Sequence, residues 1–406
     1  MSDLSHMKNN GILEPPAQEY LARRAKVNNV LQEKGLEGMV FFSSASIFYL
    51  TGSALIPTER PIAYIYRSDG ESTLFVPLLE LEHAQDSGGL YQVESYPEYP
   101  DERHPMHYLA DVLGKMKLAS AAIAADGGGY PGIFGYRGPS LTDVCPELQI
   151  TMLPQLINEL KIYKSAHEIR LMKESARWGH FAHTLLQEYT HAGLSELEVV
   201  NRASSEATSA MLRTLGPYFR LSGVDNPACY ARYRGQIGPH SYFPHSVPIN
   251  AVFKTGDTLV TGAVASVLGY RSELERVMFV GEPSQKQEHF YNLAIQAQDA
   301  AFAAIKPGKL CSEVDAEMRR FFRENKLEEY WRHHTGHAIG TGAHEAPFFD
   351  IGDHTLIEPG MCFTVEPGLY VKGLGGFRLS DTLVVTEDGF ELITYYARNI
   401  ESLICR

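Results

Sequence analysis

The sequence lacks the features that would place it in a membrane or in an oxidising compartment. No apolar run approaches the length of a membrane span, and the polar N-terminus has no apolar segment of the kind found in secretory signals. The 406 residues include only five cysteines, an odd number without any C-x-x-C pair, which favours reduced thiols over a disulfide framework. We therefore expect a cytoplasmic protein with no membrane partner.

Positive charge and phosphate-binding loops are also scarce. The 36 basic side chains are outnumbered by 49 acidic ones, for a net charge of −13, and no run of five basic residues occurs. Nucleic acid is therefore not expected as a partner. Three consecutive glycines at 127–129 lack both the G-x-G-x-x-G frame and the lysine of a P-loop, which predicts an ordinary loop and no nucleotide site.

The length of the chain predicts two domains, because 406 residues exceed what one hydrophobic core usually holds. In the first part, a helical pattern is followed by apolar runs of strand length, and Asp69-Gly70 predicts a hairpin turn between two of them. This alternation is typical of an α/β domain. The helical segment is 17–35, and the expected strands are 38–42, 62–66, 72–76 and 121–125.

Serine-led capping boxes divide the second part of the chain into helices. Ser165 and Glu168 have the spacing in which the serine oxygen accepts from an amide of the first turn and the carboxylate binds back. They begin a long helix and predict a domain boundary near 155–165. The same device, or a close variant, is expected at Ser195–Glu198, Ser284–Gln287 and Ser312–Asp315. Two helices followed by strands occur twice, which suggests a duplicated unit.

Histidines gather in the segment that ends at Glu366. It contains His333, His334, His337 and His344. His333 and His337 have the spacing of a helical metal site, but the glycines among them oppose a regular helix. Isolated histidines are more often structural groups than ligands. An unpaired buried carboxylate is costly, however, so Glu366 in its apolar surroundings requires a cation, a metal or a proton. This density of titratable groups predicts a binding site.

Two further motifs carry titratable side chains. In Arg271-Ser-Glu273-Leu-Glu275, a strand would place the three charged side chains on one face, although a solvated strand face explains the same pattern. His245 lies between two prolines that restrict its backbone. Alone, it is more often a structural residue.

Together these motifs resemble the creatinase, aminopeptidase P and prolidase family, the pita-bread hydrolases. The resemblance implies an α/β (α+β) fold, with a creatinase-type N-terminal domain at 1–160 and a duplicated pita-bread catalytic domain at 161–406. It also implies a homodimer. The matching motifs include F-Y-L-T-G at 48–52, P-H-S-V-P at 244–248, G-Y-R-S-E-L-E-R at 269–276, H-T-G-H-A-I-G-T-G-A-H-E at 334–345 and V-E-P-G-L-Y at 365–370.

For the peptidases of that family, the resemblance implies two metal ions held by two aspartates, one histidine and two glutamates. The histidine falls on His337 and the first glutamate on Glu366. The first aspartate falls on Gly262, the second on Glu273, and the last glutamate, which bridges the metals, on Ser380. Glycine offers no ligand atom and a serine hydroxyl is a poor ligand. We therefore expect no metal, or at most one manganese or zinc ion on Glu273, His337 and Glu366.

The resemblance favours a creatinase-like function, which is metal-independent hydrolysis of a C–N bond in a small carboxylate-bearing amide, amidine or lactam. It puts the general acid and base on His245 and the substrate-holding carboxylates on Glu275 and Glu366. Arg60 would reach the substrate carboxylate across a dimer interface, because a guanidinium suits bidentate carboxylate binding. Further substrate contacts are expected from Arg271, His333, His337 and His344.

Two alternatives stay open. One is an Xaa-Pro aminopeptidase or dipeptidase that uses a single metal, in which His245, His333 and His344 keep the roles that their positions resemble. The other is a catalytically inactive pita-bread protein that serves as a binding module. Metal content and cleavage of proline-containing dipeptides separate the first alternative from the creatinase-like function.

Overall fold

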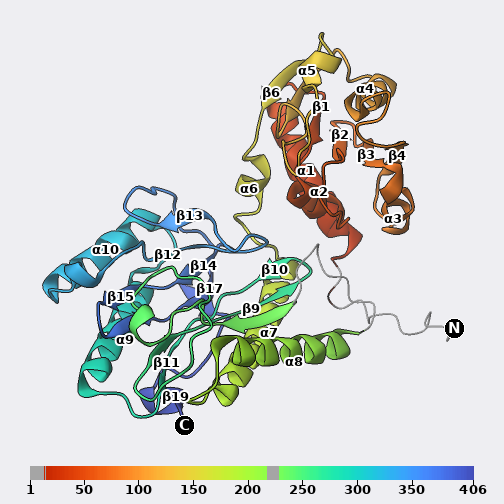
Figure 1. The fold of residues 1–406 in the computed structure, drawn as a ribbon. Helices are drawn as coiled ribbons and strands as arrows, with labels where there is room; N and C mark the ends of the chain where they lie inside the picture. Colours follow the sequence, from red (N-terminus) through yellow and green to blue (C-terminus); the bar gives the residue numbers. More distant parts are fainter. Residues whose placement is uncertain (1–12, 14, 217–227) are drawn as a thin grey trace. The chain divides into compact units, whose positions relative to one another are not determined.

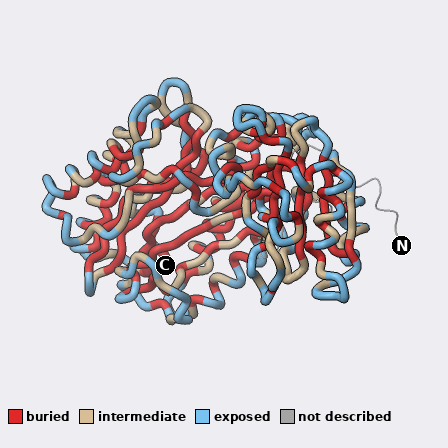
Figure 2. The backbone as a smooth tube through the Cα atoms, turned by 90° about the horizontal axis from the view of Figure 1, so that it is seen from above, coloured by how far each residue is buried: buried red, intermediate tan, exposed pale blue. Residues whose placement is uncertain are grey.

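The computed structural model describes residues 13, 15–216 and 228–406, and the chain divides into two units (Figure 1). Residues 15–160 form the N-terminal unit. Residue 13, residues 161–216 and residues 228–406 form the C-terminal unit. Each unit buries its own hydrophobic cluster, and the buried strands form the red interior of the tube in Figure 2. Both units combine helices with sheets, which confirms the α/β class expected from the sequence.

The N-terminal unit is built on a six-stranded mixed sheet in the order β4-β3-β2-β1-β5-β6. β1 (Gly38–Phe41) pairs antiparallel with β2 (Ala63–Arg67) and parallel with β5 (Ala122–Ala125). β2 and β3 (Ser72–Pro77) form the expected hairpin. All residues of β1 are buried, which explains its continuous apolar run. The other elements are α1 (Ala17–Glu33), α2 (Ser44–Thr51), α3 (Leu81–Asp86), β4 (Gln92–Tyr96), α4 (Pro105–Lys115), α5 (Leu141–Val144), β6 (Gln149–Met152) and α6 (Leu156–Leu160).

In the C-terminal unit, two long helices precede a set of strands, and this order occurs twice. The first set contains α7 (Ala166–Tyr189), α8 (Glu196–Leu215), β7 (Cys229–Arg232), β8 (Thr258–Val260), β9 (Gly262–Val267), β10 (Tyr270–Arg271) and β11 (Val277–Val280). The second set contains α9 (Gln285–Ala304), α10 (Cys311–Glu324), β12 (Gly336–Ala338), β13 (Glu345–Phe349), β14 (Cys362–Val365), β15 (Gly368–Val371), β16 (Gly375–Arg378), β17 (Asp381–Val385), β18 (Phe390–Leu392) and β19 (Ile404–Cys405). Among the described residues, none of the helices combines the length and apolarity that a bilayer crossing requires.

The capping boxes determine where most of the long helices begin. At the start of α7, the Ser165 amide donates to Glu168 Oε2 at 2.7 Å, and the Glu168 amide donates to Ser165 Oγ at 3.1 Å. The box expected to start at Ser312 is wrong. The N-cap of α10 (Cys311–Glu324) is Leu310, two residues earlier, and the Leu310 amide donates to Glu313 Oε2 at 2.7 Å. A main-chain amide supplies this bond, so the side chain at the N-cap gives no signal in the sequence.

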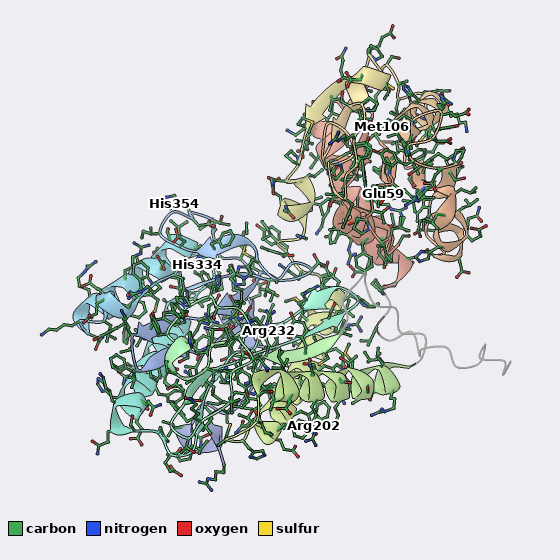
Figure 3. All side chains as sticks on the ribbon, in the orientation of Figure 1. Glu59, Met106, Arg202, Arg232, His334 and His354 are labelled. Carbon is green, nitrogen blue, oxygen red and sulfur yellow. The ribbon has the colours of Figure 1, made fainter. Side chains whose placement is uncertain are left out.

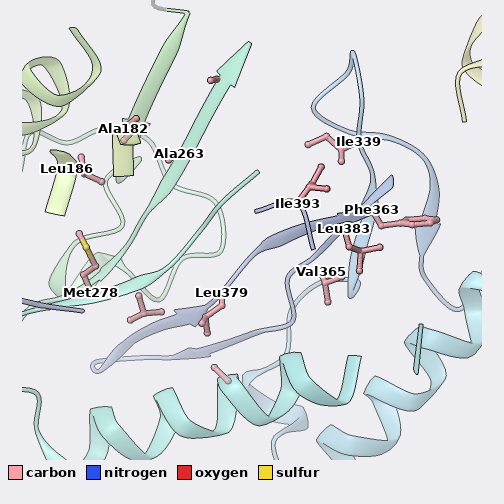
Figure 4. Packing of buried hydrophobic residues seen from close by; sticks show 14 of the residues in the cluster. Ala182, Leu186, Ala263, Met278, Ile339, Phe363, Val365, Leu379, Leu383 and Ile393 are labelled. Carbon is pink, nitrogen blue, oxygen red and sulfur yellow. The ribbon is translucent and has the colours of Figure 1, made fainter. Parts of the chain in front are cut away.

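The core of the C-terminal unit fixes the strands that carry the site. β14 and β17 are antiparallel, with Phe363 opposite Leu383, and Figure 4 shows both side chains in the same apolar layer. Val365 and Leu379 lie in this region as well, and all four side chains are completely buried. Full burial of one such side chain stabilises the fold by about 1.5–3 kcal/mol. Residues directly beyond these strand ends, including Glu366, are therefore held on a rigid frame.

A charged pair is also buried in this unit. Arg276 Nη2 donates to Asp381 Oδ1 at 2.9 Å, and both side chains are inaccessible to solvent. Gln298 of α9 donates to Asp381 Oδ2 at 3.1 Å. A buried ion pair is tolerated when its partners satisfy each other and the remaining atoms are hydrogen-bonded. Arg276 and Asp381 meet this condition and tie β17 to the segment before β11.

His183 of α7 is buried as a neutral side chain. It is completely inaccessible, its Nε2 lies 2.7 Å from Thr261 Oγ1, and its Nδ1 has no partner among the described residues. Burial, reinforced by the charge of Arg276, lowers the pKa of His183 to about 3. A proton on the imidazole would therefore oppose the folded state.

We expect His183 to make the protein sensitive to acid. Its folded-state pKa lies below the unfolded value of about 6.5, so its contribution to stability is complete above that pH and is lost as the pH falls toward 3. The slope from this residue is about 1.4 kcal/mol per pH unit. Urea unfolding between pH 7 and pH 5 should show that His183→Gln lacks this slope, whereas His289→Gln, at an exposed position, should keep it. Equal slopes in the two variants would contradict the assignment.

Candidate functional site

Three candidate ligands come together in the C-terminal unit. Glu273 lies between β10 and β11, His337 is the middle residue of β12, and Glu366 directly follows β14. One ligand atom from each residue lies within 4.8 Å of the other two. His337 is completely buried and the side chain of Glu366 is 12% exposed. Two carboxylates and one imidazole at this spacing can hold one cation.

A close approach of β12 to β14 positions His337. A Cβ atom on Gly336 would lie 2.1 Å from the Thr364 carbonyl oxygen, so only glycine fits there. The His337 amide donates to Thr364 Oγ1 at 3.1 Å, and Thr364 Oγ1 lies 3.5 Å from Glu366 Oε1. Gly336 therefore permits β12 to pack closely against β14.

The ring of His337 is oriented so that one nitrogen faces the two carboxylates. Nδ1 lies 3.0 Å from the Ala338 carbonyl oxygen, which only accepts, so Nδ1 carries the proton. Nε2 is 3.2 Å from Glu366 Oε1 but receives no well-aligned hydrogen bond among the described residues. Burial opposes the charged ring, yet the carboxylates of Glu366 and Glu273 outweigh it and raise the pKa of His337 to about 9. This nitrogen therefore requires a proton or a metal ion.

The two carboxylates of the cluster have different environments. Burial raises the pKa of Glu273 to about 7, and the charge of Glu366 adds to the effect. Burial acts in the same direction on Glu366, but His337 and Arg378 overcome it and hold the pKa of Glu366 below its ordinary value. The Ser380 hydroxyl donates to Glu273 Oε1 at 2.8 Å. A cation at the cluster would relieve the repulsion between the two carboxylates.

Glu275 is bound by two arginines. Arg378 contacts both of its oxygens, through a short Nε contact to Oε2 and through Nη2 to Oε1 at 2.8 Å. Arg234 Nη2 donates to Oε1 at 2.9 Å. Glu275 is 4% exposed, and both of its carboxylate oxygens already accept hydrogen bonds inside the protein. Its role as a substrate-holding carboxylate stays a prediction, and sequence reasoning missed both arginines.

His333 and His344 flank the cluster as neutral rings. Tyr370 connects His333 to Arg378, because Arg378 Nη1 donates to the Tyr370 hydroxyl at 3.0 Å and this hydroxyl lies 2.8 Å from His333 Nε2. The His344 ring stacks on His337 with centroids 3.9 Å apart. Burial is the main cause that lowers the pKa of His333 and of His344. Both rings can therefore accept and donate hydrogen bonds at neutral pH.

His245 and Arg271 lie at the margin of the cluster. His245 is exposed in the loop between Gly238–His240 and β8, and its charge is among the influences that lower the pKa of His344. Arg271 ends β10, where its amide donates to the Gly340 carbonyl at 2.9 Å. The strand expected to carry Arg271 to Glu275 stops at this residue, so the prediction of one continuous charged face is wrong.

Arg60 belongs to the N-terminal unit, and the residue before it in the sequence, Glu59, is labelled in Figure 3. Its Nε and Nη2 donate to Glu98 at 2.6 and 3.2 Å, and its Nη1 donates to Glu59. The bidentate face expected to bind a substrate carboxylate is therefore occupied by carboxylates of the same unit. Substrate binding by Arg60 stays a prediction that requires an exchange of these partners.

Trp331 fixes the start of the histidine segment. Its indole N–H donates to the His333 carbonyl, and the Arg319 guanidinium lies 4.7 Å from the indole centroid. Arg319 in turn donates to Asp315 Oδ2 at 2.8 Å, while the Thr335 hydroxyl donates to Oδ1 at 2.9 Å. α10 thus holds the chain immediately before β12. His334, labelled in Figure 3, lies in this segment.

Two family patterns match the chain. The pattern of the creatinase/prolidase N-terminal domain matches residues 23–131, and that of metallopeptidase family M24 matches residues 170–387, more than half of the chain. The chain belongs to metallopeptidase family M24. Among curated relatives of this M24 protein, the putative dipeptidase YkvY of Bacillus subtilis (strain 168) is 26% identical over 378 residues, which cover 93% of this chain and 99% of the relative.

Solved structures of other proteins are similar over almost the whole M24 chain. The dipeptidase PepE from Mycobacterium ulcerans is 26% identical, with a TM-score of 0.77 over 97% of this chain and 99% of that one. The recombinant prolidase from Thermococcus sibiricus is 26% identical, with a TM-score of 0.78 over 94% and 98%. These likenesses confirm the expected family and pita-bread fold, and the protein is a hydrolase of this family.

The favoured creatinase-like function is wrong. The relatives of this M24 protein carry the names of dipeptidases and prolidases, which supports the peptidase alternative. The expectation rested on the ligands missing at Gly262 and Ser380. It gave too little weight to Glu273, His337 and Glu366, which the fold still brings together. This Glu/His/Glu cluster also conflicts with the expectation that no metal is used.

We expect Glu275→Gln to destabilise this M24 protein by about 3–5 kcal/mol, because it leaves the charges of Arg378 and Arg234 without their buried partner. Chemical unfolding at neutral pH measures the effect. The control is Glu282→Gln, since Glu282 is 76% exposed and lies 3.6 Å from an exposed Arg406. That change should alter stability by less than about 1 kcal/mol. If both variants lost the same amount of unfolding free energy, the loss could not be assigned to the unpaired charges of Arg378 and Arg234.

Proposed function

We propose that this M24 protein is a peptidase of the Xaa-Pro dipeptidase or aminopeptidase type that uses a single manganese or zinc ion. The observation that carries the proposal is the convergence of Glu273, His337 and Glu366 within 4.8 Å. The names of the relatives, which are dipeptidases and prolidases, support peptides as the substrate class.

The three side chains fit one divalent ion. Within the described part of the chain, His337 Nε2 is a buried nitrogen without a well-aligned hydrogen bond, and the Ala338 carbonyl fixes the tautomer of the ring, as expected for a metal-binding imidazole. The ligand set of one imidazole and two carboxylates suits manganese or zinc. When bound there, the ion supplies a Lewis acid for the scissile carbonyl. The Ser380 and Thr364 hydroxyls hold the oxygens of the two carboxylates in place.

The neighbouring histidines supply hydrogen bonds and a proton. His333 and His344 are neutral and partly enclosed, so they can hold the polar atoms of a peptide without a change of charge. His245 is exposed beside His344 and is not part of the Glu/His/Glu cluster. We propose that His245 takes a proton from the water that adds to the carbonyl carbon and delivers it to the leaving nitrogen as the peptide bond breaks.

Two arginines are candidates for the carboxylate at the C-terminus of a dipeptide. Arg271 ends the strand that leads to Glu273. Arg60 has the bidentate geometry that a carboxylate prefers, although it has to exchange Glu98 for the substrate. A homodimer, which we also propose, would supply Arg60 from a second copy of the chain.

Removal of metal tests the proposal directly. A chelator should abolish hydrolysis of Xaa-Pro dipeptides, and manganese or zinc should restore it. His337→Ala and Glu366→Gln should lose bound metal, with an activity loss greater than the roughly 10- to 100-fold that removal of an outer-shell partner causes. His354→Ala, at an exposed position outside the cluster (Figure 3), is the control and should behave as wild type. Full peptidase activity in the chelated protein would refute the proposal.

His245 can be tested separately from the metal. We expect His245→Ala to lower kcat/KM for an Xaa-Pro dipeptide by about 10²- to 10⁴-fold, the usual contribution of a general acid or base. The metal content should stay unchanged, because His245 is outside the Glu/His/Glu cluster. His240→Ala removes another exposed histidine nearby and should leave kcat/KM within a factor of about three. Wild-type kcat/KM in the His245 variant would eliminate its role in proton transfer.

A further inference from the structure

We propose that Arg234 is a fixed cation that takes the place of a second metal ion in the site, so that the chain binds one divalent ion. This inference rests on the single metal of the proposed function. It extends that function to the residues that set the number of ions.

The carboxylate of Glu275 fills the space next to Gly262. A Cβ atom on Gly262 would lie 3.4 Å from Glu275 Oε1 and 3.8 Å from its Cγ. A side chain longer than that of alanine would therefore meet this carboxylate. The family resemblance places a metal-binding aspartate at position 262, so a carboxylate still occupies this region, but it extends from position 275.

Glu275 is not available to a metal because guanidinium groups use both of its oxygens. Arg378 binds Oε1 and Oε2, and Arg234 adds a second donor to Oε1. Arg378 Nε also lies 3.8 Å from Glu366 Oε2. The positive charge of Arg378 is therefore placed between Glu275 and Glu366 of the Glu/His/Glu cluster.

The backbone conformation around Arg234 positions its side chain next to Glu275. Arg234 has a φ of +53°, in the left-handed region, which is unfavourable for a residue with a side chain. A Cβ on the next residue, Gly235, would lie 2.0 Å from the Val247 carbonyl oxygen, and the Gly235 amide donates to Glu196 Oε1 at 2.7 Å. These contacts fix the turn after β7 and hold Arg234 at Glu275.

Ser380 is neutral at a position where the family resemblance places a negatively charged glutamate. The Glu275 amide donates to the Ser380 carbonyl at 3.0 Å, and the Ser380 amide donates to the Glu275 carbonyl at 3.1 Å. Positions 275 and 380 are therefore direct neighbours. The Ser380 hydroxyl donates to Glu273 Oε1, where the family resemblance places a bridging glutamate. A neutral group here leaves Glu273, His337 and Glu366 as the ligands for one ion.

The balance of charge decides the number of ions. Glu273, Glu275 and Glu366 contribute three negative charges and the two arginines contribute two positive ones, which leaves a net charge of −1 when His337 is neutral. One divalent ion changes this to +1, and a second would bring it to +3. Like charges at short distance repel one another more strongly in a partly buried site than in water. Repulsion from the guanidinium groups therefore opposes a second ion.

Metal counting on the full chain tests the inference. After loading with manganese chloride and dialysis, the wild type should hold one manganese per chain by elemental analysis. Arg234→Gln removes one positive charge, so calorimetric titration should show manganese binding about tenfold more tightly. The matched control is Arg232→Gln, with the same change of charge on a side chain that covers the Tyr230 ring at 5.0 Å (Figure 3). Its affinity should stay within twofold of wild type.

A second variant returns the carboxylates to positions 262 and 380. The combination Gly262→Asp, Ser380→Glu, Glu275→Thr and Arg234→Ser should hold two manganese ions per chain. If this variant does not fold, as judged by circular dichroism, the Arg234→Gln titration decides alone.

The outcomes distinguish this inference from the proposed function. Two ions in the wild type, or an Arg234→Gln affinity equal to that of the control, would overturn the role of Arg234 while leaving a metallopeptidase. A folded four-residue variant that still holds one ion would overturn it as well. A wild type that binds no manganese or zinc would instead overturn the single-metal function, and this inference with it.

Discussion

A buried carboxylate in the C-terminal unit has to be compensated by positive charge or by hydrogen-bond donors, and this constraint orders the structure around the site. Asp381 is bound by Arg276 at 2.9 Å, and Glu345 lies 3.3 Å from the buried Lys164. Each pair joins segments more than a hundred residues apart in sequence. Glu273, by contrast, has a serine hydroxyl as its nearest donor and a pKa raised to about 7. The charge of Glu273 is thus only partly compensated within the protein, and a cation can bind at this position.

Local patterns in the sequence predicted most of the framework. Alternating apolar runs and the Asp69-Gly70 turn gave the hairpin of the first sheet, and the capping box at Ser165 gave the start of α7, because both signals depend on residues close in sequence. The start of α10 was missed since Leu310 caps it through its backbone amide. The end of β10 at Arg271 was missed for another reason. The register of neighbouring strands sets it, and no local pattern records that register.

The site was predictable only in part. The resemblance to known hydrolases identified Glu273, His337 and Glu366. The predicted metal-independent reaction, however, was based on the ligands missing at Gly262 and Ser380. Arg234 and Arg378 gave no signal because they lie 41 and 103 residues from Glu275, the group they neutralise. An ion pair across such a separation appears only after folding. Absent ligands are therefore informative only when the groups that replace them are known.

The chain contains two tryptophans, and they lie in different surroundings. Trp178 is in α7, where its indole N–H donates to Glu174 at 2.8 Å. Trp331 donates to the carbonyl of His333 and lies under the Arg319 guanidinium, so its excited state senses the start of the histidine segment. Fluorescence of the unlabelled protein thus includes an optical reporter joined to the site by one hydrogen bond. Replacing Trp178 by phenylalanine would isolate that signal and allow occupancy to be followed in real time.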